Sequence, residues 1–226
     1  MRVFKMVFFL MLGLAFSHLA NAEVKLNSGL FMPTPKPISD FSLEQKDPNG
    51  KKPLTFNHQN LQNKWTLMFF GFTNCPSLCP TSMAELATAY QKLTEEKFSP
   101  LPQVVFVSVD PERDTLEKVN LFASTFNKNF LGLRTNDMNI LTRLTHETNS
   151  MFQKVPGNTT ADKNPQAHYT IDHTGDIIVF NPEGKMVAML TMPHKADDIV
   201  KDYETIVKNE GSASPDLATK IKSFFS

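Results

Sequence analysis

Two segments of the chain consist almost entirely of apolar residues. They are WTLMFFGF at residues 65–72 and VVFVSV at residues 104–109. A strand with one face in water alternates apolar and polar residues, whereas a strand covered by helices on both faces is apolar throughout. We therefore predict two neighbouring central strands in a sheet that has helices on both sides.

In four other segments, apolar residues recur at intervals of three and four, which is the spacing of one helix face. Two of these segments begin with a capping signal: Asp114 is followed by Glu117, and Asp137 precedes the next apolar stripe. The first helix follows the first central strand after a short loop. The stripes are Met83, Leu86, Ala87, Tyr90 and Leu93; Val119, Phe122, Ala123 and Phe126; Ile140, Leu141 and Leu144; and Ile199, Val200, Tyr203, Ile206 and Val207.

Short apolar runs bounded by turn residues predict the remaining strands. The sequence Asp47-Pro48-Asn49-Gly50 is typical of a turn and predicts a β-hairpin near the start of the domain. Towards the C-terminus we expect strands at residues 169–172, 177–180 and 186–190. Pro182-Glu183-Gly184 would turn the last two of these into a hairpin.

Alternating strands and helices, followed by a hairpin and a helix, predict an α/β fold. We expect a thioredoxin-like three-layer domain with a central mixed sheet and an N-terminal β-hairpin at residues 40–210. A proline-rich, extended lead-in precedes it at residues 23–39, and a polar loop lies within it at residues 156–166. The tail at residues 211–226 has room for a short helix that ends in Phe224-Phe225.

The first residues have the layout of a secretory signal. Arg2 and Lys5 precede an apolar run at residues 6–16, which is followed by the small-x-small triplet Ala20-Asn21-Ala22. We predict a signal peptide at residues 1–22 and an exported, periplasmic protein without stable membrane insertion after cleavage. The alternative is an uncleaved membrane anchor, but the apolar run is shorter than the roughly 20 residues that a spanning helix needs.

Composition narrows the classes of function. Acidic and basic residues are equal in number, 23 of each, and removal of the signal peptide would leave a slightly acidic chain. No basic segment indicates a nucleic-acid partner. Only two residues are cysteines, so the apolar core and not a disulfide framework must stabilise the fold. Export would nevertheless expose these two thiols to oxidation.

The two cysteines, Cys75 and Cys79, lie between the first central strand and the helix that follows it. The N-terminus of a helix favours negative charge, so thiolates are favoured there. A lower thiol pKa makes a cysteine a better nucleophile and a better ligand for soft metals. Pro76 and Pro80 each follow a cysteine and restrict the loop that carries the sulfurs.

Three residues separate the cysteines, which leaves room either for a disulfide or for one ion held by both sulfurs. Two thiolates select Cu(I) over hard cations, and a further ligand would have to be a histidine. We favour His173, which ends a predicted strand just before a Thr-Gly turn. Asp172 could orient it, and Asp110 follows the second central strand at the same edge of the sheet. The histidines outside the signal peptide are His58, His146, His168, His173 and His194.

Three motifs occur in a fixed order, TNCPSLCPTSMAEL, VSVDPERDT and IDHTGDIIVFNPEGK, and with them the chain from about residue 40 to residue 207 resembles the Sco/SenC family of copper-binding, thioredoxin-fold proteins. The resemblance implies one copper ion per chain, Cu(I) or Cu(II), bound by Cys75, Cys79 and His173. It implies a metallochaperone that delivers copper to the dinuclear copper site of cytochrome c oxidase, or keeps the cysteines of that site reduced. Implied partners are a copper donor, the apo copper-site subunit and a thioredoxin-like reductant.

Other functions for the cysteine pair remain open at this point. A thiol-disulfide oxidoreductase or redox-protective protein would need Cys75 and Cys79 but no obligatory copper. A structural disulfide would close too small a ring to stabilise the fold much. Arg113 near an activated cysteine would suit a peroxidase, but such an enzyme usually has a distant second cysteine. Neither the metallochaperone nor the redox function implies that the protein turns over a small-molecule substrate.

Overall fold

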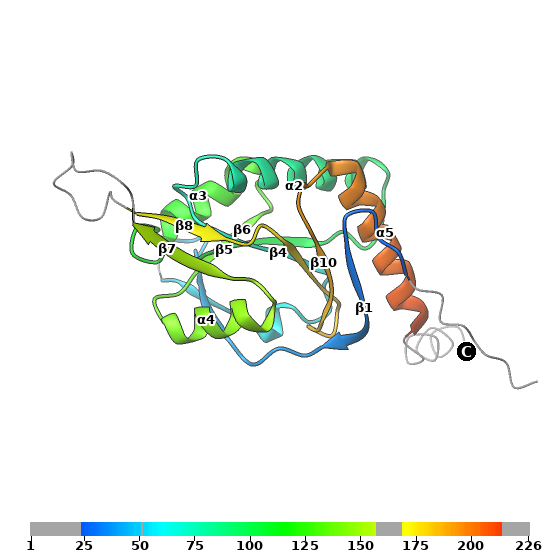
Figure 1. Ribbon diagram of the computed structural model, residues 1–226, viewed down its shortest axis with the longest axis horizontal. Coiled ribbons are helices and arrows are strands. Elements are labelled where there is room, and N and C mark those ends of the chain that lie inside the picture. Colours follow the sequence, from blue (N-terminus) through cyan, green and yellow to red (C-terminus); the bar gives the residue numbers. More distant parts are fainter. Residues whose placement is uncertain (1–23, 51, 157–168, 214–226) are drawn as a thin grey trace, which may run out of the picture.

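The computed structural model describes residues 24–50, 52–156 and 169–213 (Figure 1). An eight-stranded sheet has the strand order β1-β10-β9-β4-β5-β6-β2-β3, and β7 and β8 form a separate two-stranded sheet. The strands are β1 (Gly29–Lys36), β2 (Ser42–Gln45), β3 (Leu54–Asn57), β4 (Thr66–Gly71), β5 (Gln103–Ser108), β6 (Leu131–Arg134), β7 (Phe152–Pro156), β8 (Tyr169–His173), β9 (Ile177–Phe180) and β10 (Met186–Leu190).

Helices cover both faces of the large sheet, as the thioredoxin-like prediction requires. Helix α2 packs against both α3 and α5 on one face, while α4 lies on the other side of the sheet (Figure 1). The helices are α2 (Leu78–Glu95), α3 (Leu116–Phe126), α4 (Met138–Glu147) and α5 (Ala196–Ala213), with one turn of 3-10 helix, η1 (His58–Asn60). The mixed α/β class and the three layers are confirmed.

The two continuous apolar runs form the centre of the sheet, as predicted. Every residue of β4 is buried, and β4 pairs in parallel with β5 so that Phe69 is opposite Phe106. Their phenyl rings stack with centroids 6.3 Å apart. The N-terminal hairpin is also present, because β2 and β3 pair in an antiparallel register. These strands place the cysteine loop at the carboxyl end of a rigid, buried strand.

Helix α3 does not begin as the sequence predicts. Its N-cap is Thr115, whose hydroxyl accepts a hydrogen bond from the Lys118 main-chain N–H at 3.3 Å. Asp114, which we expected to cap this helix, is buried, and its carboxylate accepts hydrogen bonds from Thr73 instead. The cap predicted at Asp137 is confirmed, because its side chain accepts from the first main-chain N–H groups of α4.

The expected lead-in at residues 23–39 is extended, but it belongs to the sheet. Strand β1 pairs antiparallel with β10 at one edge, with a register shift between Phe31 and Lys36. Just before β1, the buried carboxylate of Asp202 in α5 accepts four hydrogen bonds, from the main-chain N–H and the side chain of both Asn27 and Ser28. The N-terminal end of the described chain is therefore fastened to α5.

Other differences concern short or terminal elements. Strands β6 and β7 were not predicted, and the strand expected at residues 169–172 belongs to the small sheet and extends to His173. Helix α5 continues to Ala213, into the expected tail. The predicted signal peptide, the polar loop beyond Pro156 and the short helix near Phe224 lie outside the described residues.

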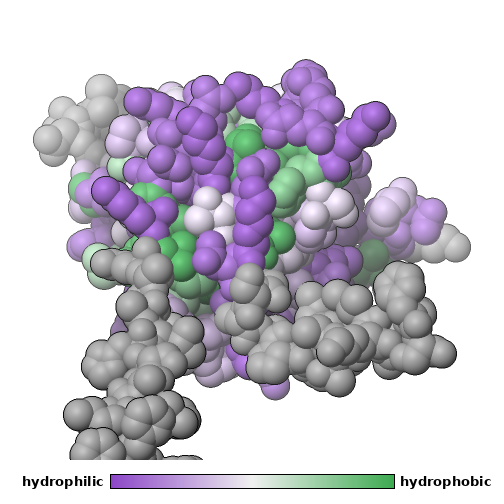
Figure 2. Space-filling model, turned by 90° about the vertical axis from the view of Figure 1, so that its right-hand side faces the viewer, coloured by the Kyte–Doolittle hydropathy of each residue, from purple (hydrophilic) through white to green (hydrophobic). Residues whose placement is uncertain are grey.

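The surface beside α5 and β1 is mostly hydrophilic, and its hydrophobic side chains occur in several separate areas (Figure 2). None of the helices in the described ranges combines the length and the apolar character that crossing a membrane would require.

Candidate metal centre

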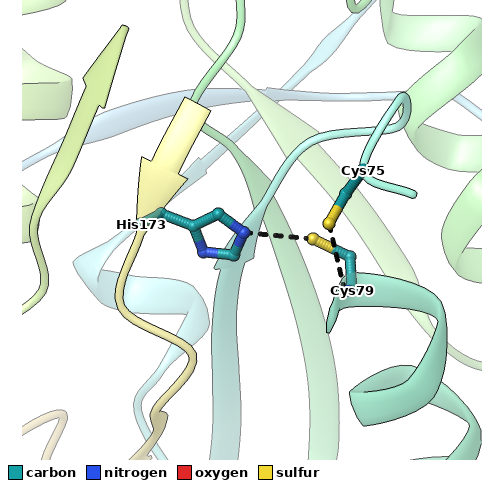
Figure 3. Close-up of side chains that lie close together, drawn as sticks. All are labelled: Cys75, Cys79 and His173. Atoms are coloured by element: carbon teal, nitrogen blue, oxygen red, sulfur yellow. Dashed lines mark hydrogen bonds between the residues drawn. The ribbon is translucent and has the colours of Figure 1, made fainter. Parts of the chain in front are cut away.

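The cysteine loop joins the end of β4 to the first turn of α2. The Cys75 main-chain N–H donates to the Phe72 carbonyl at 3.2 Å, which closes a tight turn after the strand. The N–H of Cys79, in the first turn of α2, donates to Sγ of Cys75 at 3.3 Å. Cys75 is partly exposed, whereas Cys79 is fully buried. The helix N-terminus thus points an N–H group at one sulfur and buries the other sulfur beside it (Figure 3).

His173 approaches the two sulfurs from the end of β8 (Figure 3). Its Nε2 lies 3.4 Å from Sγ of Cys79, and its Nδ1 lies 2.8 Å from the carbonyl oxygen of Thr174. A carbonyl oxygen can only accept, so Nδ1 carries the proton and donates it. In the neutral ring, the lone pair of Nε2 therefore faces the sulfurs, which is the tautomer that a metal ligand needs.

Two aromatic rings hold the imidazole in this position. The ring of His173 is nearly perpendicular to the rings of Phe72 and Phe69, at centroid distances of 5.7 Å and 6.3 Å. Both phenylalanines are buried. Because they belong to β4 and to the residue after it, the same strand supports the histidine and the cysteine loop.

The two sulfurs and Nε2 or Nδ1 of the imidazole all lie within 4.8 Å of one another. In the part of the chain that the structure describes, this is the one group of histidine, cysteine or acidic side chains close enough to share an ion. Two sulfurs and one imidazole nitrogen form a soft donor set that suits Cu(I) and fits hard cations such as Mg²⁺ poorly. The donor chemistry therefore fits the copper ion that the sequence motifs imply.

The sulfurs differ in charge because they share a proton. A hydrogen bond from the Cys79 thiol lowers the pKa of Cys75 to about 4, against the opposing effect of partial burial, and main-chain N–H groups of Cys79 and Ser77 add to the lowering. The same hydrogen bond, together with burial, raises the pKa of Cys79. At neutral pH the reduced pair therefore carries one negative charge, on the more accessible sulfur.

This asymmetry predicts that Cys75 reacts first with a thiol reagent. Alkylation of the reduced protein by iodoacetamide should modify Cys75 before Cys79, because the thiolate is the reactive form. Because its pKa is lowered, Cys75 stays ionised at pH values well below the ordinary pKa of a cysteine. The alkylation rate at Cys75 should therefore stay nearly constant down to about pH 6 and fall as the pH approaches the pKa of about 4. Peptide mapping by mass spectrometry would measure the rate at each cysteine.

The matched variants are Cys79→Ala and Cys79→Ser. Alanine removes the donor that stabilises the thiolate, so the pKa of Cys75 should rise towards its ordinary value, whereas the serine hydroxyl still donates and should preserve part of the lowering. Equal alkylation profiles for these two variants would show that the hydrogen bond from position 79 does not set the charge of Cys75.

The structure places the two predicted acidic residues away from the sulfurs. Asp110 is fully buried, but its carboxylate accepts from the Tyr169 hydroxyl at 2.6 Å and from Nε of Arg113. Asp172 is exposed and, by the alternation of a strand, faces the opposite side of β8 from His173. Asp172 was expected to orient His173, and in the structure the hydrogen-bond partner of Nδ1 of His173 is the Thr174 carbonyl.

Among the other histidines, His58, His146 and His194 are not part of the group, and His168 lies outside the described residues. His194 is buried beside the Gly175 carbonyl, at 2.6 Å, and burial lowers its pKa. Arg113, considered above for a peroxidase, forms an ion pair with Asp110. Its guanidinium is thus committed to a carboxylate, which does not favour the peroxidase reading.

Sequence reasoning missed Gly71, the last residue of β4. A Cβ atom added there would lie 2.6 Å from Sγ of Cys79 and 2.9 Å from the ring of Phe106, both shorter than real contacts. The absence of a side chain at this position therefore makes room for the buried sulfur. A glycine that ends an otherwise apolar strand just before two cysteines is the signal that could have revealed it.

Comparison with known proteins agrees with this site. The protein family described as SCO1/SenC matches residues 37–208. A protein from Stutzerimonas stutzeri, described as copper-binding, is 30% identical over 190 residues, which cover 84% of this chain and 86% of the relative. The mitochondrial SCO1 homolog 1 of Arabidopsis thaliana is 31% identical over 159 residues, or 70% of this chain, and the match spans only 43% of that longer relative.

Solved structures show the same fold. The copper-bound structure of Arabidopsis thaliana ScoI superposes with a TM-score of 0.64 at 27% identity, over 76% of this chain and 98% of that one. The apo Sco1 protein of Thermus thermophilus superposes with a TM-score of 0.63 at 33% identity, over 79% of this chain and 95% of that one. With the family match spanning most of the sequence and both solved folds covered almost completely, the chain belongs to the SCO1/SenC family.

Proposed function

We propose that this protein binds one copper ion through Cys75, Cys79 and His173 and passes it to the dinuclear copper site of cytochrome c oxidase in the periplasm. The observation that supports this proposal most strongly is the group of two sulfurs and one imidazole within 4.8 Å. It agrees with copper binding as it is described for the Stutzerimonas relative and for Arabidopsis ScoI.

The burial of the ligands suits transfer better than permanent storage. Cys75 and His173 are partly exposed, and only Cys79 is fully buried. An incoming thiolate from a partner can therefore reach the ion from the side of Cys75 and replace one ligand at a time. Ligand exchange of this kind moves Cu(I) without releasing it to water. A copper donor would load the site by the same exchange in the opposite direction.

A second function is favoured by the charge asymmetry of the sulfurs. A thiolate at Cys75 can attack a partner's disulfide, after which Cys79 attacks the mixed disulfide and releases the partner with two reduced thiols. The two electrons come from Cys75 and Cys79, which end as a disulfide, and a thioredoxin-like reductant would restore them. Because the same sulfurs serve both reactions, oxidation abolishes metal binding and bound metal protects the thiols.

The experiment that separates these functions uses the soluble copper-site domain of oxidase subunit II as acceptor. Anaerobic mixing of the Cu(I)-loaded protein with the reduced apo domain should transfer copper, which size separation and metal analysis would measure. Mixing the metal-free, reduced protein with the oxidised domain tests disulfide reduction by thiol counting.

Transfer of copper in the first mixture would support the chaperone. Reduction in the second mixture without transfer in the first would favour the oxidoreductase. Failure of both reactions would contradict a role in assembling this copper site. The matched control is Cys75→Ser, which should fail in both mixtures because Cys75 is the accessible sulfur.

A further inference from the structure

The histidine and the cysteines of the site belong to different sheets. The cysteine loop follows β4 in the middle of the eight-stranded sheet, whereas His173 ends β8, which pairs with β7 in the two-stranded sheet. Within the described ranges, no ladder of main-chain hydrogen bonds joins β8 to the large sheet. Only three residues lie between His173 and β9 of the large sheet, so this short link and side-chain contacts together set the distance between the imidazole and the two sulfurs.

One loop makes contacts of this kind with both parts of the site. The loop, residues 110–114, connects β5 to α3 and carries Asp110, Arg113 and Asp114. We call it the clamp loop. Two of its side chains, Asp110 and Arg113, contact the strand that carries the histidine, and Asp114 contacts the start of the cysteine loop.

The contact with the histidine strand is made through Tyr169. The Tyr169 hydroxyl donates to the fully buried Asp110 carboxylate at 2.6 Å, and Nη1 of Arg113 donates to the Tyr169 carbonyl at 2.8 Å. The Arg113 guanidinium also lies over the Tyr169 ring, 3.7 Å from its centroid. Tyr169 and His173 are four positions apart on one strand and so lie on the same face of β8.

The contact with the cysteine loop is equally specific. The buried Asp114 carboxylate accepts from the main-chain N–H of Thr73 at 3.0 Å and from its hydroxyl at 2.5 Å. The Ser108 hydroxyl, at the end of β5, donates to the same carboxylate at 2.6 Å. Asp114 thereby fixes the main chain two residues before Cys75 to a central strand.

Arg113 connects the two ends. Its guanidinium lies between the Tyr169 ring and the Phe72 ring, 5.6 Å from the latter. Phe72 in turn supports the imidazole of His173 and accepts the N–H of Cys75. A weaker, exposed ion pair between Glu112 and Lys154 also joins the clamp loop to β7.

We propose that the clamp loop sets the separation between His173 and the two sulfurs, with Tyr169 and Arg113 as positioning residues for the histidine. This inference rests on the proposed metal site. The two contacts of the clamp loop can be removed separately. Loss of the Tyr169 contact frees the histidine strand, while Asp114 still holds the cysteine loop.

The first test is a double-mutant cycle that measures Cu(I) affinity, because the effects of substituting two residues that act through one another do not add. Tyr169→Phe removes the hydroxyl that donates to Asp110 but keeps the ring under Arg113. It should weaken Cu(I) binding about tenfold when His173 is present and leave the affinity unchanged in a His173→Ala background. Asp172→Asn, on the exposed face of the same strand, should have no effect in either background.

An equal loss of Cu(I) affinity from Tyr169→Phe in both backgrounds, or no loss in the wild type, would overturn the proposed role of the clamp loop. If Tyr169→Phe does not give a folded protein, Arg113→Lys provides the same cycle. Lysine keeps the charge but lacks the planar group that forms hydrogen bonds with both Asp110 and Tyr169. Arg113→Lys should therefore also weaken Cu(I) binding only when His173 is present.

The second test needs no metal and separates this inference from the proposed function. In the reduced, metal-free protein, nitrogen NMR should report the His173 ring as one ordered tautomer, protonated at Nδ1. Tyr169→Phe should shift or broaden the His173 signals, whereas Asp172→Asn should leave them unchanged. Unaltered His173 signals in Tyr169→Phe would overturn the clamp even if copper binds as proposed. Altered signals in a protein that fails to bind copper would refute only the proposed function.

Discussion

Replacement of either cysteine by serine is expected to lower the affinity for Cu(I) about a thousandfold, because each sulfur would supply one of the three proposed ligands. A serine hydroxyl has nearly the same shape but is a hard and weakly acidic donor. His173→Ala should have a smaller effect, about a hundredfold or less, since both thiolates remain. Anaerobic titration of the reduced protein against a chromophoric Cu(I) chelator measures all three variants and the stoichiometry.

The control for these variants is His146→Ala, which removes an exposed histidine of α4 and should bind one Cu(I) ion as the wild type does. Binding that survives Cys79→Ser would exclude the buried sulfur from the site. Binding indifferent to His173→Ala would reduce the site to two sulfurs, although the imidazole lies 3.4 Å from one of them.

The largest loss of stability is expected from Gly132→Ala in β6. A Cβ atom at this position would lie 2.3 Å from the Val119 carbonyl oxygen and 2.6 Å from the Asn120 nitrogen. Both atoms belong to the main chain of α3, so no rotation of a side chain relieves the clash. Moving the whole helix away from the sheet should cost about 3 kcal/mol of unfolding free energy. Urea unfolding of the metal-free, reduced protein would measure it.

Gly50→Ala is the matched control, because it makes the same change where space is available. Nothing lies within 4 Å of a Cβ added to Gly50, but its φ of +72° is unfavourable for alanine, at a cost of about 1 kcal/mol. A Gly132→Ala protein as stable as Gly50→Ala would show that α3 can shift without losing its packing on β6.

The central strands and the cysteine loop could be predicted because their signals are local and unambiguous. A strand buried on both faces, such as β4, leaves a continuous apolar run, and the following helix leaves its stripe. The choice of His173 also followed from local order, since a histidine between a strand and a turn sits at a sheet edge. Its approach to within 3.4 Å of Cys79 was not predictable, because β8 and the cysteine loop are nearly a hundred residues apart.

The errors have physical causes as well. Pro33 and Pro35 argue against a strand, yet β1 tolerates them because an edge strand needs only half of its hydrogen-bonding groups. Strand β6 is four residues long and contains Gly132, which weakens any strand signal. Asp114 has the right residue type for a cap, but its carboxylate accepts hydrogen bonds from Ser108 and from Thr73. Thr73 is 41 residues away in the sequence, so its pairing with Asp114 leaves no local signal.

The fastening of Asn27 and Ser28 to Asp202 limits how far the folded domain could lie from a membrane. The apolar run of the predicted signal ends at residue 16, and ten residues, 17–26, lie between it and Asn27. Fully extended, the chain from residue 16 to Asn27 spans at most about 40 Å. A precursor that kept this apolar run in the bilayer would therefore hold Asn27 within about 40 Å of the end of the run. Cleavage after Ala22 would change the protein's range of action from one membrane patch to the whole compartment.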